Sequence, residues 1–347
     1  MSNSSRLVSI ITPSFNRADL YPETLASLKA QTYPHWEEIV VDDGSAADCL
    51  HQMRQLVCDE PRVTLLLRDR EPKGACTCRN IGVERSRGDY LIFLDTDDLL
   101  APHCLEQRVA VMEQHPELDL AIFPCEIFNK VPGDVGRWWN IDSDEDLLSR
   151  QFRMDVLCQG TGCIWRKDAF LDLGLWDESL LIWQDVDLFL RAYIRRLEIR
   201  ICFDLPRDMF YRQHSLSLSA NDYFSLPKLL SRIAVLKKNV TLLTQSSSSE
   251  IVRIAAPMAR DIYSAAVRSG HFDLARNLIN WAVGMGVITR AERIRLMSFA
   301  NLHRVGITSI PWIGSILGKA CFPRAKNPTL GQVAVSQPCA IGSPGGV

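Results

Sequence analysis

Short apolar runs alternate with amphipathic segments along the first third of the chain. Runs rich in β-branched residues are typical of buried strands, whereas apolar residues at i, i+4 and i+7 are typical of helices. The predicted strands are residues 7–12, 38–41, 63–67 and 90–94, and the predicted helices lie near residues 21–28, 50–57 and 77–85. This alternation with short links predicts an α/β fold with a doubly wound, mainly parallel sheet.

The pattern is less regular further along and then becomes helical. We expect strands at residues 120–123 and 199–203, a loop at 131–146 and a helix at 185–196. From about Ser225 the pattern is helical, and residues 255–283 resemble a helical hairpin that turns at Gly270. We therefore divide the chain into residues 1–110, 111–224, a helical region 225–326 and a tail 327–347. The tail is rich in Gly, Pro, Ser and Gln, and we expect it to be disordered.

Composition narrows the class of protein. The 347 residues carry a formal net charge of -2, so the basic face typical of nucleic-acid binding is not expected. No apolar stretch approaches the roughly 20 residues that cross a bilayer, and no signal peptide is evident. The 11 cysteines are scattered without a C-x-x-C pair, which favours reduced thiols in a reducing compartment over a zinc site.

Polar residues follow three of the predicted strands. Residues 13–16 follow the first strand, Asp42 and Asp43 the second, and residues 95–98 the fourth. Ligands of doubly wound sheets bind beyond the carboxyl ends of the strands. The three clusters are therefore predicted to form one site.

Asp95 and Asp97 are the centre of this site. Two carboxylates two positions apart can share Mg²⁺ or Mn²⁺ with a substrate diphosphate, because these ions prefer oxygen ligands. The alternative is a solvated turn or a helix cap. Asp98 adds a third acid within the same four residues, and such crowding disfavours folding unless a cation or hydrogen-bond donors compensate.

Asp43 and Phe15 each allow two interpretations. Asp43 could accept a hydrogen bond from a nucleotide base or ribose, or it could belong to an Asx turn with Gly44 that ends the strand. Phe15 could stack on the base or be an ordinary half-buried aromatic residue.

Several segments resemble the inverting glycosyltransferases of family 2, which have the GT-A fold. They are residues 8–16, 27–32, 38–45, 74–82, 88–98, 160–191 and 211–215, and the resemblance weakens after about Ser219. The resemblance implies a GT-A type sheet with a C-terminal helical extension. It also implies that residues 1–110 bind the nucleotide sugar and that residues 111–224 hold the acceptor and the catalytic base.

The resemblance also assigns roles to individual residues. Asp95 would touch the ribose or the sugar, Asp97 would bind the metal, and Asp98 would orient its neighbours. The residues that would contact the nucleotide or diphosphate are Pro13, Phe15, Asn16, Asp43 and Arg79. Arg212 or His214 would neutralise the leaving group, and His214 could reach the metal, although a histidine in a polar loop is often only a surface residue.

Asp185 matches the position of the catalytic base in this family. The preceding residue is Gln184, where the family usually has Glu, so the sequence departs from the pattern there. The alternative for Asp185 is a carboxylate that caps the amino terminus of a helix.

The resemblance implies metal-dependent transfer of a sugar from a nucleotide sugar, usually a UDP-sugar, to an acceptor hydroxyl with inversion. The expected acceptor is a saccharide or a lipid-linked saccharide, in polysaccharide or glycolipid synthesis at the cytoplasmic face. The apolar residues 312–322 could contact a membrane surface, and the alternative, which the pattern favours, is ordinary helix packing. The rival is a catalytically impaired scaffold that binds nucleotide sugars, which only Gln184 favours. A nicotinamide dehydrogenase is disfavoured because residues 13–16 lack its glycine-rich turn.

Overall fold

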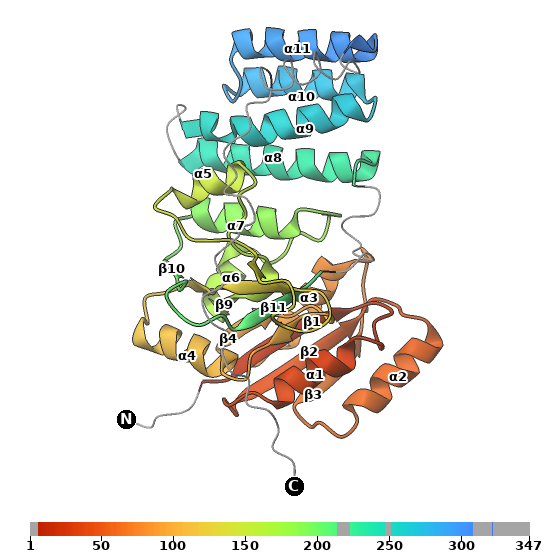
Figure 1. Ribbon diagram of the computed structural model, residues 1–347, viewed down its shortest axis with the longest axis vertical. Helices are drawn as coiled ribbons and strands as arrows, with labels where there is room; N and C mark the ends of the chain where they lie inside the picture. Colours follow the sequence, from red (N-terminus) through yellow and green to blue (C-terminus); the bar gives the residue numbers. More distant parts are fainter. Residues whose placement is uncertain (1–5, 214–222, 247–250, 308–320, 322–347) are drawn as a thin grey trace.

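The computed structural model describes residues 6–213, 223–246, 251–307 and 321. It consists of a sheet domain with a stack of helices on one side of it, which we call the helical extension (Figure 1). His214, the tail 327–347 and nearly all of the apolar residues 312–322 lie outside the described residues.

The main sheet confirms the predicted mainly parallel α/β fold. The strands β1, β2, β3 and β4 are parallel to one another, as are β6 and β10, whereas β9 runs antiparallel to both of its neighbours. In spatial order the strands are β10 (Ile199–Ile201), β6 (Leu120–Ile122), β9 (Cys163–Arg166), β4 (Tyr90–Phe93), β1 (Val8–Ser14), β2 (Trp36–Asp42) and β3 (Val63–Leu67).

The register of the central strands places the polar clusters at one edge. Ser14 at the end of β1 is paired with Asp42 at the end of β2. Phe93 at the end of β4 is paired with Ile11, so the loop after β4 also leaves from this edge. The structure thus confirms that the segments after β1, β2 and β4 share one edge of the sheet.

Helices cover both faces of this sheet and form a three-layer structure. The apolar side chains of one face pack with α1 (Tyr21–Lys29), α2 (Ala47–Val57) and α4 (Cys104–Gln114). Those of the other face pack with α3 (Ala75–Arg85), α6 (Lys167–Leu173) and α7 (Gln184–Ile194). Gly82 lets α3 approach the sheet closely, because a Cβ atom there would lie 2.3 Å from Cγ2 of Ile11.

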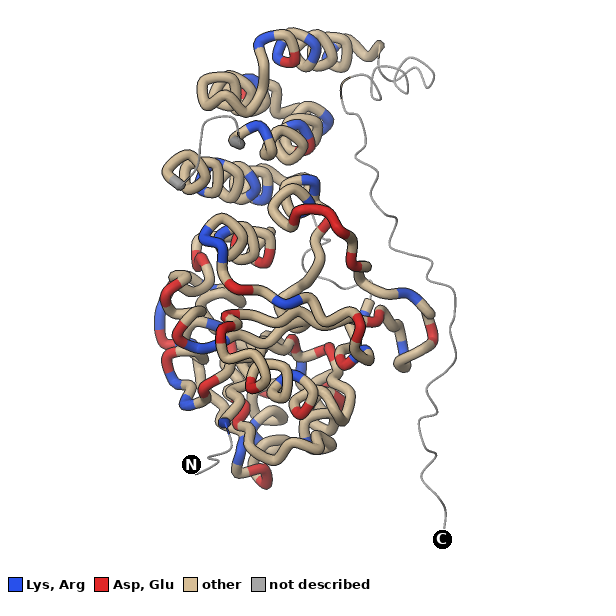
Figure 2. The backbone as a smooth tube through the Cα atoms, turned by 90° about the vertical axis from the view of Figure 1, so that its left-hand side faces the viewer, with Lys and Arg blue, Asp and Glu red and all other residues tan. Residues whose placement is uncertain are grey.

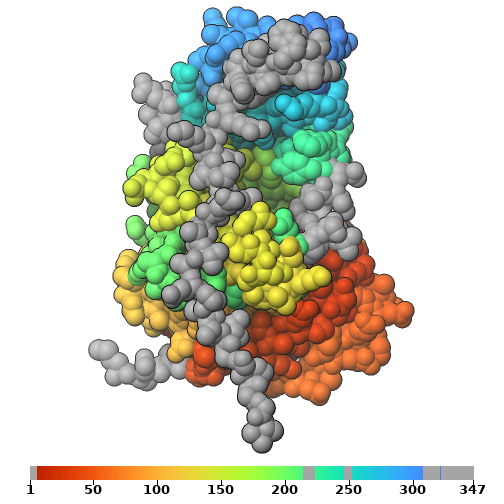
Figure 3. Space-filling view, viewed as in Figure 1, coloured from red at the N-terminus to blue at the C-terminus, as the bar shows by residue number. Residues whose placement is uncertain are grey.

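A second, four-stranded sheet was not predicted from the sequence. Its strands are, in order, β5 (Leu99–Leu100), β11 (Met209–Arg212), β7 (Cys125–Phe128) and β8 (Arg137–Trp138). These strands are too short to show an alternating pattern, and β11 pairs with β5 more than a hundred residues away. The expectation of a continuous loop at residues 131–146 is wrong, because β8 lies within it. In the space-filling view the segment around residues 130–160, yellow, lies between the sheet domain and the helices (Figure 3).

The helical extension has its own apolar core. It contains α8 (Leu226–Ser246), η2 (Ile251–Ala255), α9 (Ala256–Arg268), α10 (Phe272–Gly284) and α11 (Arg290–Arg304), and α5 (Leu147–Phe152) packs beside them. Helices α9 and α10 confirm the predicted hairpin, and Gly270 lies between them with a positive φ of 78°. None of the described helices is long and apolar enough to cross a membrane. The ten cysteines in the described ranges are free thiols.

Helix α7 belongs to both cores. Leu188, Phe189 and Ala192 pack toward the sheet, whereas Val186, Leu190 and Ile194 pack into the core of the helical extension. The position of α7 is therefore fixed from two sides.

The buried ion pair of Arg108 and Asp208 provides a test of this fold. Both side chains are fully buried, and the guanidinium also donates to the carbonyl oxygens of Thr161 and Cys163. We expect Arg108→Ala to lower the free energy of unfolding by about 3–5 kcal/mol, because Asp208 would be left buried and unpaired. Urea unfolding measures this loss. The control Arg276→Ala removes the exposed pair with Asp273 and should cost about 1 kcal/mol or less; equal losses would contradict the prediction.

Candidate active site

Asp42 and Asp43 follow β2 and have different surroundings. Asp42 Oδ2 accepts hydrogen bonds from the backbone N–H groups of Gly44 and Ser45, at 3.0 and 2.9 Å. The Asx turn that was the alternative for Asp43 is therefore made by Asp42. Asp43 Oδ1 instead accepts from Arg68 Nε at 2.8 Å and from the N–H of Gly74 at 3.1 Å. Asp43 thus links the ends of β2 and β3 to the start of α3.

Phe15 and Asn16 lie in the loop after β1, beside this turn. The half-buried ring of Phe15 has the ammonium group of Lys73 above it, 3.7 Å from the ring centroid. Asn16 has a positive φ of 53°, and its Oδ1 accepts from the N–H of Ala46 at 2.8 Å. Asn16 therefore joins the loops after β1 and β2, and its predicted contact with the nucleotide stays a prediction, as does that of Pro13.

The loop of residues 95–98 is held mainly through its backbone. The hydroxyl of Thr24, on α1, donates to the carbonyl oxygens of Thr96 and Asp98 at 2.9 and 3.0 Å. Arg212 Nε donates to the carbonyl oxygen of Asp97 at 2.8 Å. The same guanidinium pairs with Glu23 at 2.6 Å. The structure therefore places Arg212 against the backbone of this loop, and its predicted contact with the leaving group stays a prediction.

Asp98 is the buried member of the acidic cluster. Its carboxylate accepts hydrogen bonds from the N–H of Arg212 at 3.0 Å and from the hydroxyl of Thr161 at 3.3 Å. Burial raises the pKa of Asp98 well above its ordinary value, and the charges of Asp97 and Asp95 raise it further. Asp98 thus ties the loop to Arg212 and Thr161, and the orienting role expected of it stays a prediction.

Arg79 brings the loop after β4 together with α3. Its Nη2 donates to Asp95 Oδ1 at 2.7 Å, and its guanidinium carbon lies 4.7 Å from the centroid of the Trp176 ring. The Arg79 side chain is only 8% exposed, whereas that of Asp95 is 42% exposed. Asp95 therefore faces the solvent-accessible side of a buried cation.

Asp185 lies beside the same cation, at the second position of α7. The residue that caps α7 is Trp183, with a positive φ of 64°, and it makes no capping side-chain hydrogen bond. Oδ1 of Asp185 is buried and has no hydrogen-bond partner among the described residues. The alternative that Asp185 caps the helix is therefore wrong, and its carboxylate has an unused acceptor.

The surroundings of Asp185 favour a proton acceptor. Burial raises its pKa from 3.8 to about 6, the positive charge of Arg79 and the amide of Gly160 oppose the rise, and the charge of Asp95 adds to it. A Cβ atom on Gly160 would lie 3.1 Å from Asp185 Oδ1 and 3.3 Å from the Trp176 ring. A glycine at this position leaves room for the carboxylate.

The turn before α7 is tied to α3. Asn80 Nδ2 donates to the carbonyl oxygen of Trp176 at 2.9 Å, and Asn80 Oδ1 accepts from the N–H of Trp176 at 3.0 Å. Glu178 accepts from Asn80 and from Arg70, at 2.8 and 2.9 Å. Trp176 is thus held in place as one wall of the Arg79 site.

The oxygen ligands at this edge fit a divalent cation that is shared with a substrate. No group of three or more His, Cys, Asp or Glu side chains that could hold a metal occurs in the described part of the chain. Asp97 lies in a cluster whose negative charge raises the pKa of Asp98, which a cation would offset. Mg²⁺ is commonly held by one or two carboxylates and the oxygens of a diphosphate. The residues present therefore suit this arrangement and not a cage built from protein ligands alone.

Several residues of this site were missed from the sequence. Thr24 contacts the loop of residues 95–98 and has no distinctive local pattern. Glu23 pairs with Arg212, which is 189 positions away. Gly160 and Trp176 lie in the segment 160–191 that resembles the family, but the sequence did not place them beside Asp185 and Arg79.

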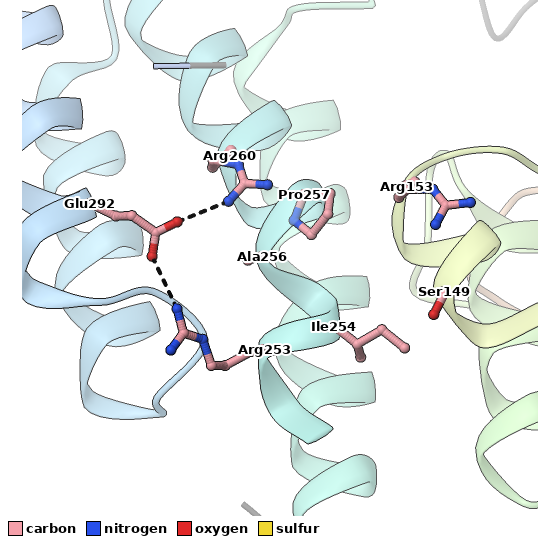
Figure 4. Close-up of a pocket in the computed structure, with 8 residues that line it drawn as sticks. All are labelled: Ser149, Arg153, Arg253, Ile254, Ala256, Pro257, Arg260 and Glu292. Atoms are coloured by element: carbon pink, nitrogen blue, oxygen red, sulfur yellow. Dashed lines mark hydrogen bonds and ion pairs between the residues drawn. The ribbon is translucent and has the colours of Figure 1, made fainter. Parts of the chain in front are cut away.

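A cavity of about 310 Å³ lies elsewhere, between α5 and the helical extension (Figure 4). Its charged groups are mainly paired: Glu292 lies 3.1 Å from Arg260 and 3.8 Å from Arg253, and Arg153 pairs with Glu145. In the described part of the chain, both acidic and basic residues occur on the sheet domain and on the helices (Figure 2). The cavity contributes no group to the site at the sheet edge.

The raised pKa of Asp185 predicts a conflict between function and stability. A carboxyl group whose pKa is higher in the folded than in the unfolded protein costs stability as the pH rises from about 4 to about 6. Asp185→Asn should therefore increase the free energy of unfolding at about pH 8, by about 1–3 kcal/mol, and the increase should shrink toward about pH 5. Urea unfolding at the two pH values measures both.

Asp187→Asn is the matched control. Asp187 is fully buried and accepts hydrogen bonds from Arg191 and Asn239, so removal of its charge should destabilise the protein. If Asp185→Asn is destabilising to the same extent at about pH 8, the ionised carboxylate of Asp185 is not costly and the prediction fails.

The sequence and the fold were compared with known proteins. Residues 9–174 match the sequence model of glycosyl transferase family 2. An uncharacterized glycosyltransferase of Haemophilus influenzae is 30% identical over 190 residues, which are 53% of this chain and 61% of the relative. The Escherichia coli UDP-Glc:alpha-D-GlcNAc-diphosphoundecaprenol beta-1,3-glucosyltransferase WfgD is 34% identical over 106 residues, which are 30% of this chain and 41% of the relative. The chain thus spans less than two thirds of the length of these relatives.

Solved structures share the fold at low sequence identity. The structure of S. aureus TarS 1-349 in complex with UDP-GlcNAc has a TM-score of 0.57 at 17% identity and covers 86% of this chain and 92% of that one. The mannosyltransferase PcManGT from Pyrobaculum calidifontis, in complex with GDP-Man and Mn²⁺, has a TM-score of 0.50 at 16% identity, with coverages of 86% and 84%. Residues 9–174, just under half of the chain, thus match glycosyl transferase family 2, and the fold is shared with these solved structures.

Proposed function

We propose that this protein is an inverting glycosyltransferase that transfers a sugar from a nucleotide sugar to an acceptor hydroxyl. The observation that carries the proposal is the carboxylate of Asp185, whose buried Oδ1 has no hydrogen-bond partner in the described part of the protein. It lies close enough to Arg79 for that charge to lower its pKa, and Arg79 in turn pairs with Asp95 on the donor side. The proposed catalytic base, Asp185, and the proposed donor site around Asp95 therefore lie next to the same cation, Arg79.

The donor would bind across the carboxyl edge of the sheet. Asp43 and Phe15 would contact the nucleotide base. Asp95 and Arg79 would contact the ribose, the sugar or the diphosphate. A UDP-sugar is favoured because the relative WfgD is named for UDP-Glc and the TarS structure holds UDP-GlcNAc. Pro13 and Asn16, in the loop after β1, would also lie beside the nucleotide base.

Asp97 would hold a divalent cation, Mn²⁺ or Mg²⁺, together with the diphosphate, and His214 is a second candidate ligand. The Mn²⁺ in the PcManGT structure supports a metal of this kind. Such a cation supplies charge that stabilises a departing diphosphate.

The residues of the chain account for the transfer itself. Asp185 accepts the proton of the acceptor hydroxyl while the acceptor oxygen bonds to the anomeric carbon. The bond between this carbon and the diphosphate oxygen breaks, and its electron pair leaves with the diphosphate. Attack from the side opposite the leaving group inverts the configuration, and no covalent intermediate with the enzyme is required.

The rival interpretation is a scaffold that binds nucleotide sugars without turnover. It rested on Gln184, whose side chain donates to the carbonyl oxygen of Leu180 at 3.1 Å. Gln184 therefore contacts the turn before α7, and the Asp185 carboxylate next to it lies near Arg79. The presence of this carboxylate favours the enzyme over the scaffold.

The proposed setting is bacterial polysaccharide or glycolipid synthesis, with a saccharide or lipid-linked saccharide as acceptor. The name of WfgD, which specifies a diphosphoundecaprenol-linked acceptor, supports the second kind. A location at the cytoplasmic face, with peripheral membrane contact, is consistent with such an acceptor.

Donor turnover tests the reaction class. Wild type, Asp97→Ala and Asp185→Asn are assayed for nucleoside diphosphate release from a panel of nucleotide sugars, with Mn²⁺ or with a chelator. We expect one donor to turn over only with metal, no turnover for Asp97→Ala, and a loss of about 10²–10⁴-fold for Asp185→Asn. Tight donor binding without turnover, even with acceptor extracts, would support the scaffold, and the absence of any binding would refute the nucleotide-sugar site.

The pH dependence of the reaction tests the base. Asp185 must be ionised to accept a proton, and burial raises its pKa to about 6. We expect kcat/KM to fall about tenfold per pH unit below about pH 6 and to level off above it. Initial rates at low donor and acceptor concentrations, with donor binding measured at each pH, give this profile. A rate that stays constant down to about pH 5 would contradict the assignment of Asp185.

A further inference from the structure

The proposed base lies on a segment that is held from outside the sheet domain. We call residues 177–187 the base segment, since Asp185 lies within it. Helix α8, the first helix of the helical extension, contacts this segment before and after Asp185. The base segment also follows the last residue, 174, of the region that matches the family model.

Lys238 joins two points of the base segment. Its Nζ donates to Asp177 Oδ2 at 2.6 Å and to Asp187 Oδ2 at 2.9 Å. The neighbouring Asn239 donates from Nδ2 to Asp187 Oδ1 at 2.9 Å. Asp187 is fully buried, so its hydrogen bonds to Lys238 and Asn239 are charge-assisted and its carboxylate is shielded from water, whereas Lys238 is itself 34% exposed. Consecutive residues of α8 thus fix α7 two positions beyond Asp185.

Ser231 holds the backbone just before α7. Its hydroxyl oxygen accepts from the N–H groups of Leu181 and Ile182, at 3.1 and 3.3 Å. The same hydroxyl lies 3.1 Å from the carbonyl oxygen of Ile182, to which it can donate. The buried Ser231 hydroxyl therefore serves as the hydrogen-bond partner of the backbone N–H groups of Leu181 and Ile182 in this turn.

Trp183 shows why such support is needed. It has a positive φ of 64°, a conformation that a bulky residue adopts only when its surroundings impose it. Its indole N–H donates to Tyr223 Oη at 3.3 Å, and the guanidinium of Arg232, on α8, lies over the Tyr223 ring at 3.6 Å. Residues at and before α8 thus stabilise the strained start of α7.

We propose that Lys238 and Ser231 are positioning residues, through which the helical extension sets the location of the Asp185 carboxylate. This inference rests on the proposed function, in which Asp185 is the base. The donor-side residues Asp43 and Asp95 make their hydrogen bonds within the sheet domain, to Arg68, Gly74 and Arg79. Loss of the α8 contacts should therefore impair the chemical step and leave donor binding intact.

Lys238→Met and Ser231→Ala remove these contacts without emptying the core. Asp187 keeps Arg191 and Asn239 as partners when Lys238 is replaced, so the variant retains a paired carboxylate. The matched control is Lys237→Met, because the Lys237 ammonium lies 5.5 Å from the Trp281 ring on α10 and not on the base segment. Thr241→Ala is the control for the serine, since its hydroxyl donates to the carbonyl oxygen of Lys237 within α8.

The experiment uses the full chain with the nucleotide sugar that the panel identifies. A displacement of about 1 Å can cost about 10²-fold in rate, so we expect Lys238→Met to lower kcat by about 10- to 100-fold, with a smaller loss for Ser231→Ala. The Kd and KM for the donor should stay within about twofold of wild type, and the two controls should match wild type. Lys238→Arg, which keeps the charge, should restore part of kcat.

A double variant separates positioning from general stability. The effects of substitutions that act through one group do not add. Lys238→Met should therefore cause no further loss of kcat in an Asp185→Asn background. Three outcomes would each overturn the inference. They are a further loss of kcat from Lys238→Met in the Asp185→Asn background, a parallel loss of donor binding, and equal kcat for Lys238→Met and Lys237→Met. If wild type binds no nucleotide sugar, the proposed function itself fails and the inference falls with it. Normal wild-type turnover with any of the other three outcomes overturns the inference alone.

Discussion

The buried charge of Arg79 is the constraint on which the site depends. A guanidinium that is removed from solvent must be paired, and Arg79 is paired by Asp95, with Asp185 close enough for their charges to interact. Arg79 lies on α3, Asp95 follows β4 and Asp185 lies in the first turn of α7, so one cation connects three segments far apart in the sequence. Trp176 and Gly160 enclose this cation and its second carboxylate. The arrangement leaves two acids of different character, an exposed Asp95 that is directly paired and a buried Asp185 that keeps an unused oxygen.

The different character of these acids follows from how their segments are held. The loop of residues 95–98 is fixed through its carbonyl oxygens by Thr24 and Arg212. Asp185 is fixed instead through helix α7, which packs into two apolar cores at once. A helix that is buried on both faces cannot shift without disturbing either core, since protein interiors are close-packed. The helical extension therefore helps to hold α7, and with it the proposed catalytic base Asp185, in place.

The sequence predicted the parts of this protein that depend on local pattern. The central strands, the hairpin of α9 and α10 and the acidic loop after β4 all follow from apolar periodicity and from residues within a few positions of one another. The second sheet could not be predicted, because β5 and β8 have two residues each and their pairing partners are distant in the sequence. The Arg212–Glu23 pair and the Thr24 hydrogen bonds are invisible in the sequence for the same reason. The family resemblance identified Asp185, and only the structure showed that it does not cap its helix.

The partners of Asp185 and Asp187 differ although the two residues lie within one turn of α7, the first as the proposed catalytic base and the second as a structural carboxylate. Asp187 is surrounded by Arg191, Lys238 and Asn239, which satisfy its charge and make it a fixed point of the fold. Asp185, two positions earlier, points to a different side of α7, where burial raises its pKa to about 6 and Arg79 only partly offsets the cost. A carboxylate with full pairing would be a weak base near neutral pH, and one without any cation nearby would be largely protonated. Asp185 has one nearby cation without full pairing, which gives its carboxylate a basicity suited to the proposed acceptance of a hydroxyl proton. The paired carboxylate of Asp187, two positions later, holds α7 and thereby Asp185 in place.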